Sequence, residues 1–261
     1  MKIALVDSGI GLLPAAAAVR RARPDADLVL SCDPDSMPWG PRTGDDIAAH
    51  ALACARAAAR HEPDALIVAC NTASVHALPL LRDELEPGLP VVGTVPAVKP
   101  AAAAGAPVAI WATPATTGSP YQQRLIETYG NGADVTPVPC HGLADAVESA
   151  DEAAVDAAIA AAAALTPHDV AAVVLGCTHY ELVGERIRDA VTRTGVPAPA
   201  LHGSAEAVAA QALRRIGAAA DPDARPTGTL TVLLSGSPGP LPAAAAAYAE
   251  GRLPAAESVG T

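Results

Sequence analysis

Phenylalanine is absent from the 261-residue sequence, and tryptophan and tyrosine contribute only two and four residues. The hydrophobic fraction of 51% includes long alanine tracts, so valine, leucine and isoleucine must build the core. No apolar stretch approaches the roughly 18 to 20 residues that cross a bilayer, because Asp151, Glu152 and Asp156 interrupt the alanine tract near them. The opening MKIALVDSG has one basic residue and a short apolar run, unlike a secretory leader. We therefore expect a soluble, cytoplasmic protein without a membrane partner.

Basic residues are also scarce, since 17 lysines and arginines face 28 acidic residues for a net charge of −11. Such a field repels phosphate backbones, which argues against a nucleic-acid partner. Lys2 lies at the start of the first expected strand, and Lys99 precedes Pro100 in an expected linker between lobes. Neither lysine suits the Schiff base that pyridoxal phosphate requires. Gly9 and Gly11 are not part of a complete GxGxxG dinucleotide-binding motif. Because neither pyridoxal phosphate nor a nucleotide has a binding sequence here, we expect no cofactor.

The five cysteines are odd in number and form no CxxC pair, which argues against a disulfide framework and a four-cysteine zinc site. A metal site built from Cys177 and His179 with Cys140 and His141 is the alternative to weigh. Adjacent Cys-His pairs do not easily direct both side chains at one ion, and no second paired motif completes a closed set. We therefore expect reduced thiols and no metal.

Short apolar runs alternate with helix-like segments, a pattern typical of parallel sheets covered by helices. The predicted strands span residues 2–6, 27–32, 65–69, 91–94, 108–112, 134–138, 171–175 and 229–234. The predicted helices span residues 47–60, 72–86, 152–165, 185–194 and 205–216. The 21 glycines and 25 prolines are concentrated between these runs, where they end the elements.

A weak internal repeat divides the chain into two similar halves. DALIVACNTASVHALPLLRDEL, from Asp64, aligns with VAAVVLGCTHYELVGERIRDAV, from Val170, and IALVDSGIG pairs with VAIWATPAT in the same order. Each repeat reads as a strand, a polar turn and a helix. We therefore predict an α/β protein of two similar lobes, residues 1–96 with 205–261 and residues 97–204, related by a pseudo-twofold axis. Ligands of open α/β sheets bind at the carboxyl ends of the strands, so the active site is expected in the cleft between the lobes.

Cys70 and Cys177 occupy matched points of this repeat, each directly after a strand and at or near a helix start. Backbone N–H groups and the helix dipole stabilise a thiolate there and make it available as a base. A single cysteine after a strand is usually a small buried hydrophobe, but two at matched positions favour chemistry. Asp7 and Ser8 follow the first strand beside glycines that permit close approach of a ligand, although a helix start without a ligand would read the same way. Cys32, Cys54 and Cys140 lack such contexts, and Cys54 is expected to pack within its helix.

These motifs together resemble those of a known family. Asp7-Ser8-Gly9, Pro38-Trp39-Gly40, Cys70-Asn71-Thr72-Ala73-Ser74, Ala112-Thr113-Pro114-Ala115-Thr116 and Gly176-Cys177-Thr178-His179-Tyr180 follow the order and approximate spacing of the cofactor-independent glutamate racemases, within the aspartate/glutamate racemase superfamily. The similarity runs from residue 1 to roughly residue 250. It implies an isomerase that interconverts L- and D-glutamate for peptidoglycan synthesis in the cell wall, with an amino acid as its small-molecule partner.

The resemblance also implies roles for individual residues. Cys70 would remove the α-proton of the D-enantiomer and Cys177 that of the L-enantiomer, with the opposite thiol returning a proton. Asp7 and His179 would assist the thiols, and Glu148 would be a further acidic helper. The substrate's amino and carboxylate groups would be held, partly by backbone atoms, by Ser8, Pro38, Trp39, Gly40, Asn71, Thr72, Thr113, Thr116 and Thr178.

Some positions depart from the family's pattern. Gly11-Leu12 replaces Gly-Gly, Trp39 replaces tyrosine, Glu181 replaces proline and Gly203-Ser204 replaces Asp-Ser. The indole of Trp39 cannot offer a phenolic hydroxyl, but its N–H can serve a different acceptor. A related racemase acting on aspartate or another amino acid, in secondary metabolism for example, therefore stays open, as does a ligand-binding paralogue without activity. The sequence leaves the oligomeric state open as well, and a homodimer is compatible with it.

Overall fold

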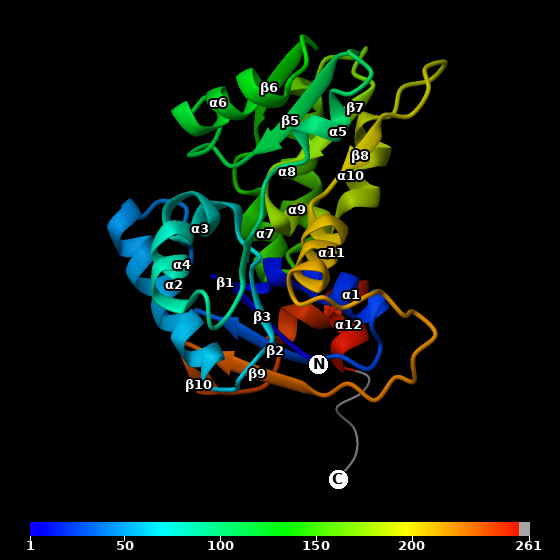
Figure 1. The fold of residues 1–261 in the computed structure, drawn as a ribbon. Helices are drawn as coiled ribbons and strands as arrows, with labels where there is room; N and C mark the ends of the chain where they lie inside the picture. Colours follow the sequence, from blue (N-terminus) through cyan, green and yellow to red (C-terminus); the bar gives the residue numbers. More distant parts are fainter. Residues whose placement is uncertain (256–261) are drawn as a thin grey trace. The chain divides into compact units, whose positions relative to one another are not determined.

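The computed structural model describes residues 1–255, which fold into two compact units. Within the described chain, residues 1–94 and 205–255 belong to unit 1, and residues 95–204 form unit 2. Each unit contains its own sheet with helices packed on it (Figure 1). Within the described residues, no helix combines the length and apolar character that a bilayer crossing requires.

Unit 1 is built on a six-stranded sheet in the order β10-β9-β2-β1-β3-β4. The strands are parallel except for β10, which pairs antiparallel with β9. Their bounds are β1 Lys2–Asp7, β2 Asp27–Cys32, β3 Ala65–Val68, β4 Val91–Gly93, β9 Leu230–Leu234 and β10 Ser237–Pro238. The central strands β1 and β3 are almost wholly buried, as expected for parallel strands covered on both faces.

Helices cover both faces of this sheet (Figure 1). One group, containing α2, packs its alanines with Ile47 and Cys54 against β1 and β3. A second group contains α1, which packs on α11 and α12. The first group is α2 Gly44–Ala59, α3 Asn71–His76 and α4 Leu78–Leu85, and the second is η1 Ile10–Leu12, α1 Leu13–Ala22, α11 Ala205–Arg215, η2 Ala243–Ala247 and α12 Ala249–Ala255.

Unit 2 repeats the central topology of unit 1 in a four-stranded parallel sheet, ordered β6-β5-β7-β8. This order matches β2-β1-β3-β4 strand for strand. One core cluster joins Val108 and Ile110 of β5 and Val174 of β7 to helices α5 and α6. The strands are β5 Val108–Ala112, β6 Val135–Pro139, β7 Ala172–Leu175 and β8 Ala200–His202. The helices are α5 Val98–Ala101, α6 Pro120–Tyr129, α7 Leu143–Ser149, α8 Glu152–Leu165, α9 Thr178–Glu181 and α10 Gly184–Val191.

The main error of the sequence prediction is the single helix at residues 72–86. The structure divides it into α3 and α4, with Ala77 between them. Pro79 in the first turn of α4 has no N–H to donate, and its ring would clash with the carbonyl of Val75 in a continuous helix. A helix therefore ends before this proline and a new one begins around it.

The sequence prediction also assigned no range to several elements. Helix α1 is buried from Leu13 to Arg20, so it lacks the polar face that marks an amphipathic helix. The segment around Lys99 forms the short helix α5, whereas we expected a linker there. The other elements without a predicted range are η1, α6, α7, α9, η2, α12, β8 and β10.

Candidate active site

Most of the predicted site residues of unit 1 lie where β1 and β3 end. These strands are paired in register, Val6 with Val68, so the residues that follow them lie side by side. Asp7 is fully buried, and its Oδ1 accepts the backbone N–H of Ser8 at 2.7 Å. Strand order reverses beside β1, and the carboxyl edge at such a reversal is where open α/β sheets bind ligands.

Cys70 stands at the N-cap of α3, two residues beyond the end of β3. Its backbone is extended, with φ −140° and ψ 121°, and the residue is 7% exposed. Asn71 is also buried and Thr72 is half-buried. The N-terminal N–H groups of α3 therefore begin next to the thiol, where they favour negative charge.

Cys177 occupies the equivalent place in unit 2. It lies at the N-cap of α9, two residues beyond the end of β7, with φ −136° and ψ 135°. Cys177 is half-buried, and Thr178 and His179 after it are buried. The two cysteines thus share strand order, offset from the strand and backbone conformation, each within its own unit.

A polar relay reaches the Cys177 thiol. Its Sγ lies 3.9 Å from Nδ1 of His179, and Nε2 of the same ring lies 2.8 Å from Oε2 of Glu148 on α7. The side chains of His179 and Glu148 are only 10% and 15% exposed. A carboxylate on one ring nitrogen fixes the orientation of the imidazole, which leaves the other nitrogen directed at the thiol.

Thr113 and Thr116 follow β5, the strand of unit 2 that corresponds to β1. The Thr113 hydroxyl donates to that of Thr116 at 3.2 Å, and the backbone N–H of Thr116 donates to the carbonyl of Thr113 at 2.9 Å. Both residues are half-buried. The turn therefore presents hydroxyls at the carboxyl edge of the sheet, beside the strand that leads to Cys177.

The segment Pro38-Trp39-Gly40 follows β2 in unit 1. Pro38 is exposed, and a side-chain carbon built on Gly40 would meet nothing within 4 Å, so a ligand has room beside this backbone. Trp39, in contrast, is 1% exposed and its indole N–H donates to Asp33 at 3.2 Å. Its ring is therefore part of the protein's interior, and sequence reasoning missed the acceptor, Asp33.

Two positions in unit 2 that depart from the family's pattern, Glu181 and Gly203-Ser204, are in direct contact. Oε1 of Glu181 accepts the backbone N–H and the hydroxyl of Ser204 at 2.8 and 2.9 Å. A side-chain carbon on Gly203 would lie 2.3 Å from Oε2 of Glu181. Glu181 thus occupies the space that a side chain at position 203 would need, which makes the two departures one structural change.

The other three thiols are buried. Cys54 is 3% exposed within α2, which confirms its predicted packing role, and Cys32 and Cys140 are each 1% exposed. Desolvation by burial raises the pKa of Cys54 and of Cys140 to about 12. A thiol that stays protonated is a poor base. Among residues 1–255, no three histidine, cysteine or acidic side chains converge as a metal site would require.

The two α/β units share the order of four parallel strands, and each has a cysteine at the start of the helix that follows β3 or β7. These features define a class of α/β proteins built from two similar units. The family model for Asp/Glu/Hydantoin racemase matches residues 13–212, and the chain belongs to this family.

Similar proteins agree with that assignment. A glutamate racemase from Roseiflexus sp. is 39% identical over 194 residues, covering 71% of this chain and 70% of its own. One from Granulibacter bethesdensis is 37% identical over 219 residues, covering 81% of this chain and 77% of its own. The crystal structure of Escherichia coli glutamate racemase with L-glutamate and an activator superposes with a TM-score of 0.78 at 25% identity, covering 94% of this chain and 91% of that one.

Proposed function

We propose that this protein is a glutamate racemase that interconverts L- and D-glutamate without a cofactor, using Cys70 and Cys177 as its two bases. The observation that carries the proposal is the equivalence of the two cysteines: each follows the same strand of the same topology with nearly the same backbone angles. Racemisation needs a base for each enantiomer, and a duplicated half-site supplies two. The relatives that are 39% and 37% identical are glutamate racemases, which supports glutamate as the substrate.

The reaction moves one proton away from the α-carbon and brings another to its opposite face. With D-glutamate, the Cys70 thiolate takes the α-proton and the Cys177 thiol delivers its own proton to the planar carbanion. With L-glutamate the two thiols exchange roles. Each turnover leaves one thiol and one thiolate, so atoms and charge balance.

The α-proton beside an ionised carboxylate is very weakly acidic, so the developing charge must be stabilised by groups that are already in place. The helix starts at Asn71 and Thr178 supply backbone N–H donors next to each thiol. His179, held by Glu148, directs its Nδ1 at the thiol on the Cys177 side. On the Cys70 side, Asp7 ends the neighbouring strand β1, one residue after the pair Val6–Val68 and one residue short of the level of Cys70, and we assign it the corresponding supporting role.

We assign binding of glutamate's carboxylates and ammonium group to the remaining predicted residues. They are Ser8, Gly40, Thr113 and Thr116, in the turns after β1, β2 and β5, and Asn71, Thr72 and Thr178, which follow the two cysteines in the chain. At Pro38 and Trp39 only the backbone is assigned to the substrate, because the indole is buried. The product D-glutamate then serves peptidoglycan synthesis in the cytoplasm.

Both sequence features that suggested another amino acid have internal partners. The Trp39 indole contacts Asp33, and Glu181 contacts Ser204, so neither needs a different substrate to explain it. These contacts favour glutamate over the alternative.

The test is incubation of the purified protein with L-glutamate in D2O, with no cofactor added. We expect D-glutamate that carries deuterium at the α-carbon, and much slower turnover of aspartate and other amino acids in a parallel panel. Absence of both exchange and change in optical rotation would refute the proposal, and faster turnover of another amino acid would replace the substrate.

A further inference from the structure

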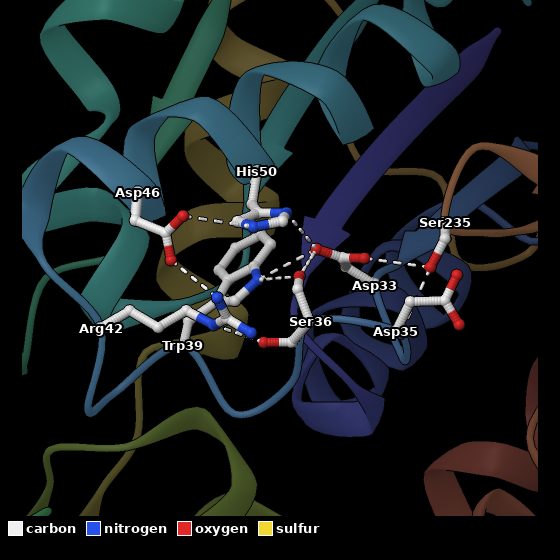
Figure 2. Close-up of polar contacts among 8 residues, drawn as sticks. All are labelled: Asp33, Asp35, Ser36, Trp39, Arg42, Asp46, His50 and Ser235. Carbon is white, nitrogen blue, oxygen red and sulfur yellow. Dashed lines mark hydrogen bonds and ion pairs between the residues drawn. The ribbon is translucent and has the colours of Figure 1, made fainter.

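The segment between β2 and α2 is organised around the buried carboxylate of Asp33, whose side chain is 6% exposed. Its Oδ2 accepts the Ser36 hydroxyl and the Trp39 indole N–H, and lies 3.2 Å from Nδ1 of His50. Its Oδ1 accepts the Ser235 hydroxyl at 3.0 Å. Figure 2 shows these side chains converging on the carboxylate from the segment itself, from α2 and from the β9–β10 turn. Four polar partners meet the hydrogen-bonding capacity of a carboxylate, which offsets the cost of burying it.

The backbone of Asp33 fixes the segment to the candidate active site. Its N–H donates to the carbonyl of Ser8 at 3.0 Å, which ties it to the turn after β1. Its carbonyl accepts the N–H groups of Ser36 at 3.3 Å and Met37 at 3.1 Å, which folds the chain just before Pro38. One residue thus joins two turns to which substrate binding is assigned.

Arg42 secures the other end of the segment. Its Nε donates to the Ser36 carbonyl at 2.6 Å, and its guanidinium pairs with Asp46 at 2.7 Å. The backbone N–H of Arg42 also donates to the carbonyl of Trp39 at 3.1 Å. Asp46 in turn lies 3.5 Å from Nε2 of His50, which closes the network visible in Figure 2.

We propose that Asp33 is a positioning residue for substrate binding, and that Trp39 acts as its internal partner and not as a side-chain contact to the substrate. The inference rests on the proposed racemase function for its assay. Asp33 is buried and its oxygens are engaged, so it acts on the substrate only through the backbone of Ser8 and of residues 38–40. Tryptophan suits this place because its indole N–H is a donor only and faces a group that accepts.

The first test compares Asp33→Asn with the wild-type protein in the racemase assay. Asparagine keeps the shape but turns one oxygen into an NH2 group that faces incoming donors, so the segment must shift. We expect KM for glutamate to rise about tenfold or more, the effect of losing one charge-assisted hydrogen bond, while kcat changes less. Turnover with an unaltered KM would overturn the inference, and so would a loss of kcat with KM unchanged.

Matched pairs keep the test decisive if Asp33→Asn does not fold. Ser36→Ala and Trp39→Phe each remove one donor to Asp33 and should raise KM. Ser31→Ala removes a buried hydroxyl of β2 that donates to the Cys54 carbonyl, and Trp111→Phe removes a buried indole N–H that donates to Thr166. Both controls should leave KM unchanged. Ser36→Ala is compared with Ser31→Ala, and Trp39→Phe with Trp111→Phe. Equal KM values within each pair would contradict a positioning role.

Fluorescence supplies a readout that needs no substrate. The chain has two tryptophans, so Trp39 is the only indole left in a Trp111→Phe background. Asp33→Asn in that background should shift the emission of Trp39 to the red as its ring meets water, whereas Ser31→Ala should not. If the wild-type protein turns over no glutamate, the proposed function fails, and this shift still decides whether Asp33 holds the segment. Unchanged emission would overturn the inference.

Discussion

Replacing Glu148 with glutamine removes the charge that orients His179 and leaves a side chain of the same shape. The two groups are 2.8 Å apart and their side chains are 15% and 10% exposed, so solvent screens the contact only weakly. A hydrogen bond to a charged group in such a place contributes about 1.5–3 kcal/mol. At about 1.4 kcal/mol per factor of ten, the steps in which His179 assists Cys177 should slow by about 10- to 150-fold.

The assay supplies each enantiomer separately in D2O and follows by NMR the α-deuterium that appears in the enantiomer supplied, which is exchange without inversion. Enantiomers have equal free energies, so kcat/KM must fall equally in both directions, and only proton exchange separates the thiols. Exchange from L-glutamate, for which Cys177 is the base, should fall by the factor above, and exchange from D-glutamate should fall less. Asp145→Asn, which removes an exposed charge from the same helix, is the control. Equal losses for both enantiomers, or none, would refute the reasoning.

Two further predictions concern stability. Gly203→Ala should lower the free energy of unfolding by about 1–3 kcal/mol, because the new carbon displaces Glu181 from Ser204. The loss should be smaller in a Glu181→Ala background, which a double-mutant cycle measured by chemical denaturation can check. Burial raises the pKa of Cys54 and Cys140 to about 12 from an ordinary 9.0, so above pH 9 the folded state retains thiol protons that the unfolded state releases. The free energy of unfolding should therefore be unaffected by these thiols below pH 9. It should fall as pH rises toward 12, by up to about 1.4 kcal/mol per pH unit for each thiol. Cys54→Ala should make that slope shallower, and parallel slopes would contradict the burial argument.

Local sequence predicted most of the strands well, but it missed β8, β10 and the capped helix α6. The bounds of β2 and β5 agree with the prediction because both are apolar runs, each buried on both faces between clear turn signals. Helix α8 spans Glu152–Leu165, as predicted, and the side chain of Asp151 caps its start. Helix α1 could not be recognised in the same way, because its alanines are buried on all sides and carry no period.

The candidate site was predictable only where it repeats. Cys70 and Cys177 stand out because the same strand-turn-helix unit occurs twice, and Glu148 entered through family resemblance alone. Asp33 was missed because Asp33-Pro34-Asp35 reads as an ordinary turn. Its role depends on Ser235, 202 positions away, and on Ser8 in another turn, so no local pattern carries it.

The most direct test of the two-thiol mechanism is α-proton exchange in D2O by the variants Cys70→Ala and Cys177→Ala, with each enantiomer of glutamate supplied separately. Cys70→Ala should exchange the proton of L-glutamate only, Cys177→Ala that of D-glutamate only, and neither should racemise. Racemisation by either variant, or exchange of both enantiomers by one of them, would contradict the assignment of one base to each face.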